Sequence, residues 1–76
     1  MDIINKLEEL FLELKESNNK PRYINIIDDI EQVISSATSK EKIIITKFLN
    51  QIINENPEDA WMYESFYQGL INDVNN

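Results

Sequence analysis

Apolar residues recur at helical spacing in four segments of this chain, and no segment alternates apolar and polar residues over the length of a strand. In the first segment, Leu7, Leu10, Phe11 and Leu14 follow the pattern of an amphipathic helix. A strand repeats every two residues and a helix every 3.6, so this spacing restricts the chain to helices packed on one another. The sequence predicts an all-α fold with helices at about 2–17, 22–36, 39–54 and 57–73.

Short breaks separate the four segments. Pro21 cannot continue the first helix, and Thr38 with Glu41 three residues later has the spacing of a capping box at the start of the third. At the last break, Asn56 is predicted to cap the fourth helix and Pro57 to occupy its first position. Short connections make consecutive helices antiparallel neighbours, which predicts a compact antiparallel four-helix bundle and a single domain.

Each predicted helix has one apolar face, which we expect to form the core. The third helix has the widest apolar arc, as suits a helix between two neighbours. Gly69, the only glycine, lies within the fourth helix, where it would allow close packing or end the helix early. The predicted core residues are Ile3, Ile4, Leu7, Leu10, Phe11 and Leu14; Tyr23, Ile26, Ile27, Ile30, Val33 and Ile34; Ile44, Ile45, Phe48, Leu49, Ile52 and Ile53; and Met62, Tyr63, Phe66, Tyr67, Leu70 and Val74.

Cysteine and histidine are both absent from the chain. Disulfides, thiolate nucleophiles and serine–histidine pairs within the chain are therefore excluded, and the commonest zinc ligands are missing. A single glycine cannot build a glycine-rich phosphate loop. We expect that the protein is not an enzyme and that it binds no cofactor and no metal.

Fourteen acidic residues against seven basic ones leave a formal net charge of −7. Nucleic acids and anionic lipids repel such a chain, because phosphate binding depends on lysine and arginine, whereas a basic protein attracts it. The charge would alternatively serve only to keep a small protein in solution. No run reaches the roughly 18 apolar residues that span a membrane, and the N-terminus lacks signal-peptide features. We expect a cytoplasmic protein with a basic protein partner.

Residues 55–67 combine acidic and aromatic side chains, and residues 48–76 contain no lysine or arginine. On a helical wheel Trp61 lies about 140° from Phe66, away from the expected core. Tryptophan dominates binding hot spots, so an exposed Trp61 between acids is the predicted anchor for a partner. The alternative is that Trp61 folds back over the preceding linker or over the first helix. The predicted partner-binding residues are Trp61, Glu64, Glu55, Glu58, Asp59, Tyr63, Tyr67, Asp28 and Asp29.

Several of these residues also have a purely structural interpretation. Glu58 and Asp59 complement the dipole at the start of the fourth helix, and Tyr63 and Tyr67 suit the edge of the core. Other acids, such as Glu9, Glu13 and Glu16 on the first helix, are expected to form a solvated face. Neither the helix dipole nor core packing explains the presence of Glu55, Glu64 and Trp61.

The leading hypothesis is a small acidic inhibitor that covers the positive surface of a basic toxin or nuclease. In size, charge and helical content the chain is similar to the colicin nuclease immunity proteins, although no segment carries their motifs. One alternative is a regulatory adaptor or phage-type antagonist that mimics the charge of nucleic acid. A second is a self-associating helical module, in which the third helix and Ile43 are buried in a homodimer.

Overall fold

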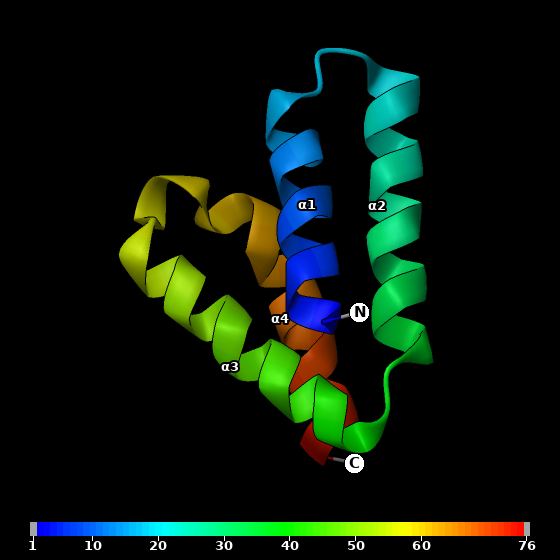
Figure 1. The fold of residues 1–76 in the computed structure, drawn as a ribbon. Helices are drawn as coiled ribbons and strands as arrows, with labels where there is room; N and C mark the ends of the chain where they lie inside the picture. The colour runs from blue at the N-terminus through cyan, green and yellow to red at the C-terminus, as the bar shows by residue number, and fades with distance from the viewer. Residues whose placement is uncertain (1, 76) are drawn as a thin grey trace. The chain divides into compact units, whose positions relative to one another are not determined.

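Two pairs of helices make up the fold, one pair in each half of the chain (Figure 1). The computed structural model describes the backbone of residues 2–75 and the side chains of residues 2–73. This part of the chain contains four α-helices, one 3₁₀ turn and no strand, so the predicted all-α class is confirmed. The chain divides into two compact units, Met1–Ala37 and Thr38–Asn76. That residues 1–76 form a single domain stays a prediction.

The first unit is a hairpin of α1 (Ile3–Glu16) and α2 (Lys20–Ser36), which lie side by side and antiparallel (Figure 1). Asp2 caps α1, because its carboxylate accepts a hydrogen bond from the Ile4 N–H at 3.0 Å. The buried side chains of this unit all lie on the predicted core faces, and they are Leu7, Leu10, Phe11, Leu14, Ile26 and Ile30.

Helix α2 begins two residues before its predicted start. The Asn19 side chain accepts a hydrogen bond from the Arg22 N–H at 3.2 Å, and Pro21 lies in the first turn. A proline there loses no helical hydrogen bond, since the first N–H groups of a helix have no acceptor within it. Pro21 thus comes after the end of α1, as predicted, but it belongs to the next helix and not to the break.

The second unit contains α3 (Ser39–Glu55), the 3₁₀ turn η1 (Pro57–Asp59) and α4 (Ala60–Asn75). The predicted capping box is confirmed at the start of α3. The Glu41 N–H donates to the Thr38 hydroxyl at 3.1 Å, and the Thr38 N–H donates to the Glu41 carboxylate at 2.8 Å. Two of the N–H groups at this end therefore have partners within the chain.

Asn56 occupies the N-cap position of η1 and Pro57 follows it, as predicted, but the side chain of Asn56 makes no cap hydrogen bond. Its side-chain amide donates to the Ile52 carbonyl at 3.4 Å, and its backbone N–H donates to the same oxygen at 2.8 Å. Asn56 therefore ends α3, and its side chain does not cap η1. Pro57 then begins the 3₁₀ turn, and α4 begins three residues later than predicted, at Ala60.

The buried residues of the second unit are Ile45, Leu49, Met62, Tyr63 and Leu70. Ile44 departs from its predicted core position, since it is 45% exposed. Helix α4 continues through Gly69, where an added Cβ would meet nothing within 4 Å, so neither expected role of this glycine is observed. The Val74 side chain lies outside the described residues. The remaining predicted core residues are half-buried: Ile3, Ile4, Tyr23, Ile27, Val33, Ile34, Phe48, Ile52, Ile53, Phe66 and Tyr67.

Candidate functional site

Trp61 lies in the first turn of α4 with 63% of its surface exposed, more than any other large apolar side chain of the described residues. The alternative in which it folds back over the linker therefore does not occur. A tryptophan usually buries most of its large apolar area, so this exposure is an unfavourable arrangement for an isolated chain. The start of α4 therefore carries a large apolar ring that the described chain leaves in contact with water.

Glu58 and Glu64 flank Trp61 three residues before and three residues after it, and both are exposed. Three residues are close to one turn of helix, so the carboxylates lie on either side of the indole along one face. We call Glu58, Trp61 and Glu64 the acidic tryptophan surface. It joins two negative charges to a flat apolar ring.

The turn before α4 determines where Glu58 lies. Pro57 restricts the backbone of η1, and the Asp59 N–H donates to the Asn56 carbonyl at 3.0 Å. Glu58 is thus held in the turn that leads directly into α4, three residues before Trp61. Asp59 itself is only half-exposed, so it contributes less to the surface than predicted.

Glu55 belongs to a different element from the acidic tryptophan surface. It lies in the last turn of α3, where its carboxylate accepts a hydrogen bond from the Gln51 side chain at 3.2 Å. This bond ties Glu55 to its own helix, one turn back. The role predicted for Glu55 beside Trp61 has no contact to support it, although the side chain is exposed.

The other predicted partner-binding residues are not part of this surface. Tyr63 is only 9% exposed and belongs to the core, and Tyr67 is half-buried. These positions agree with the structural interpretation, in which both tyrosine rings lie at the edge of the core. Asp28 and Asp29 are exposed on α2, in the first unit, and their participation stays a separate prediction.

Two exposed apolar side chains were not predicted from the sequence. Leu12 on α1 is 57% exposed and Ile24 on α2 is 49% exposed. The signal for Leu12 was present, because Glu9 and Glu16 lie one turn from it on either side. An apolar residue flanked by acids at helical spacing belongs to the polar face, whatever its own hydrophobicity.

The interior offers no second site among the described side chains. None of their buried nitrogen or oxygen atoms lacks a hydrogen-bond partner, and no three acidic side chains are placed to hold a metal ion. Open depressions lie along the second half of α2 and beside the connection between α1 and α2, and exposed polar side chains line both. None of the described helices is long and apolar enough to cross a membrane. The candidate site is therefore a surface and not a cavity.

Comparison of the chain with protein-family models, with curated proteins and with solved structures finds no match.

Proposed function

We propose that the protein is a small acidic inhibitor of the immunity type, which neutralises a basic toxin or nuclease by covering its positive surface. The observation that carries this proposal is the exposed indole of Trp61 between two exposed carboxylates. Trp61 supplies the apolar anchor, and Glu58 and Glu64 supply charges of the sign that a basic surface attracts.

Charge and anchor have different effects on binding. A net charge of −7 accelerates encounter with a basic partner, by about 10- to 1,000-fold when the charges are complementary. A buried tryptophan then slows dissociation, because its apolar area must be returned to water before the partners separate. An inhibitor of a toxin needs both properties, since the toxin acts for as long as it remains free.

The test is capture of a partner from extract of the native cell on the immobilised protein, washed at rising salt. The variant Trp61→Ala with Glu64→Lys removes the anchor and reverses one charge. Its matched control is Ile24→Ala with Glu31→Lys, which removes an exposed apolar side chain and reverses one exposed acid on α2. Both variants change the net charge equally. A difference in capture between them therefore reports on this surface and not on the net charge of the protein.

We expect the wild type and the control to retain a basic protein that elutes as salt rises, and the Trp61 variant to lose it. The captured protein's activity should fall when the wild-type chain is added back in equimolar amount. Equal retention by both variants would show that the acidic tryptophan surface is not the binding site. Release of the captured protein by DNA, in a salt-dependent manner, would instead favour mimicry of nucleic-acid charge.

A further inference from the structure

Helix α3 carries a second apolar strip, on its solvent-exposed side. Ile43 is 46% exposed and Ile44 is 45% exposed, and the exposed Lys40 and Lys47 lie one turn before and one turn after them. At about 100° per residue, both lysines fall between the two isoleucines around the helix axis. The four residues therefore form one line along α3, which we call the lysine–isoleucine strip.

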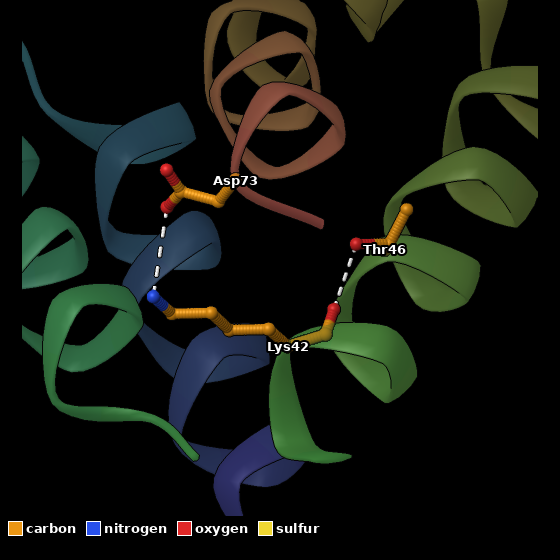
Figure 2. Close-up of polar contacts among 3 residues, drawn as sticks. All are labelled: Lys42, Thr46 and Asp73. Atoms are coloured by element: carbon orange, nitrogen blue, oxygen red, sulfur yellow. Dashed lines mark hydrogen bonds and ion pairs between the residues drawn. The ribbon is translucent and has the colours of Figure 1, made fainter. Parts of the chain in front are cut away.

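The charges of this strip are available to a partner. The other lysine of α3, Lys42, lies 3.5 Å from the Asp73 carboxylate on α4 (Figure 2). Among the described side chains, no ion pair joins Lys40 or Lys47 to a carboxylate. The strip is thus a local basic and apolar surface on a chain whose net charge is −7. A partner that fits it presents an apolar residue between two acids.

Helix α1 presents that arrangement. Leu12 is 57% exposed, and the exposed Glu9 and Glu16 lie one turn before and one turn after it. Glu9 and Glu16 are seven residues apart, as are Lys40 and Lys47. At 1.5 Å per residue, both charge pairs span about 10.5 Å of helix with an apolar centre. We call Glu9, Leu12 and Glu16 the glutamate–leucine strip.

We propose that two copies of the chain associate by packing the glutamate–leucine strip of one copy on the lysine–isoleucine strip of the other. The equal spacing allows both glutamates to meet lysines, whether the two helices run parallel or antiparallel. Leu12 then covers Ile43 and Ile44, which removes apolar area from water on both sides. None of the residues in this contact belongs to the acidic tryptophan surface.

Pairing of α3 with α3 of a second copy is less favourable. Either orientation of two such helices in register brings lysines of one strip against lysines of the other. Like charges in contact oppose association, whereas the glutamate–leucine strip brings opposite charges together. We therefore propose a contact between α1 and α3 in place of the homodimer through α3 that the sequence suggested.

The test is sedimentation equilibrium of the full chain at about 0.15 M salt, where repulsion between the acidic molecules is screened beyond about 8 Å. The samples are the wild type, Glu9→Lys with Glu16→Lys, Lys40→Glu with Lys47→Glu, and an equimolar mixture of these two variants. Lys6→Glu with Lys20→Glu changes the net charge as the α3 variant does, at exposed positions outside both strips. Far-UV circular dichroism establishes that each variant keeps its helices.

We expect the wild type and the Lys6/Lys20 control to dimerise and each strip variant to dimerise at least about tenfold more weakly. The mixture should recover the dimer, because the lysines that replace Glu9 and Glu16 in one variant can face the glutamates that replace Lys40 and Lys47 in the other. The Glu9/Glu16 variant is the sharpest case. It makes the net charge less negative and so lowers the repulsion between copies. If net charge alone controlled association, this variant would associate more strongly than the wild type, whereas loss of the strip contact makes it associate more weakly.

Three results would each overturn the proposal. The first is a monomeric wild type up to about 1 mM, a concentration at which an association of about −4 kcal/mol is half-formed. The second is a mixture that associates no better than its two components. The third is an unchanged dimer in the Glu9/Glu16 variant, which would show that the glutamate–leucine strip takes no part in self-association.

Discussion

Lys42 and Asp73 connect the beginning of α3 to the end of α4, with Nζ of the lysine 3.5 Å from Oδ2 of the aspartate (Figure 2). The Lys42 backbone is held at the same time, since its carbonyl accepts a hydrogen bond from the Thr46 hydroxyl at 2.7 Å. Helices whose opposite ends meet in this way are antiparallel. The ion pair therefore closes the hairpin of the second unit at the end far from η1.

Replacing Asp73 with Asn should lower the free energy of unfolding by less than about 1 kcal/mol, because exposed ion pairs contribute little. The Asp73 side chain is 59% exposed, so solvent screens most of the attraction. Urea unfolding at low and at high salt measures the effect, which should shrink as salt rises. Exchange of the two residues, Lys42→Asp with Asp73→Lys, should restore part of the loss. A loss well above this range, unaffected by salt, would show that Asp73 acts through packing.

Thr38→Ala should destabilise the chain by about 1 kcal/mol, because it removes the acceptor for the Glu41 N–H at the start of α3. Thr46→Ala is the matched control. The Thr46 hydroxyl donates within α3 to a carbonyl that is already part of the helix, so its loss costs little and alanine favours the helix. Thermal unfolding of both variants makes the comparison, and equal losses would contradict the assigned role of the capping box.

The sequence pattern predicted the capping box and the buried faces of the helices, because interactions between residues close together in the chain determine these features. The capping box of Thr38 and Glu41 and the buried positions Leu7 and Leu49 result from spacing along one helix. The N-cap position predicted for Asn56 is observed, but its side-chain cap does not form, because the side chain has two competing uses: it can cap the next turn or, as observed, donate back to Ile52. The choice between them depends on backbone geometry at the turn, which residue type does not determine.

The candidate site was predictable to a similar degree. A helical wheel placed Trp61 away from the core, and the positions of Glu58 and Glu64 result from their spacing to it. Ile44 was assigned to the core because its hydrophobicity suited a wide apolar arc. Its exposure depends on how many neighbours α3 has, and this is a property of tertiary packing that periodicity within one helix does not contain.

Gly69→Ala should raise the free energy of unfolding by about 0.5–1 kcal/mol. The glycine lies within α4 with a helical neighbourhood on both sides, and a Cβ there would meet nothing within 4 Å. Alanine loses less backbone freedom on folding than glycine does, and here it incurs no steric cost. Urea unfolding monitored by circular dichroism measures the gain. A destabilised variant would mean that residue 69 is in contact with a neighbour in the folded chain.

Leu7 and Leu12 provide a comparison of the same substitution at two positions of α1. Leu7 is 0% exposed and Leu12 is 57% exposed. Leu7→Ala should cost about 2–5 kcal/mol, because it removes buried apolar contacts and leaves a cavity. Leu12→Ala should change stability by less than about 0.5 kcal/mol, since alanine also suits an exposed helical position.

Both leucine variants are measured by urea unfolding at low micromolar concentration, so that self-association does not contribute to the transition. The difference between them matters more than either value, because the substitution removes the same atoms from the same helix. A large loss at Leu12 in dilute solution would show that its side chain is buried within one chain. A small loss in dilute solution that grows with protein concentration is the result expected if Leu12 packs on a second copy, since association then stabilises the folded state by mass action.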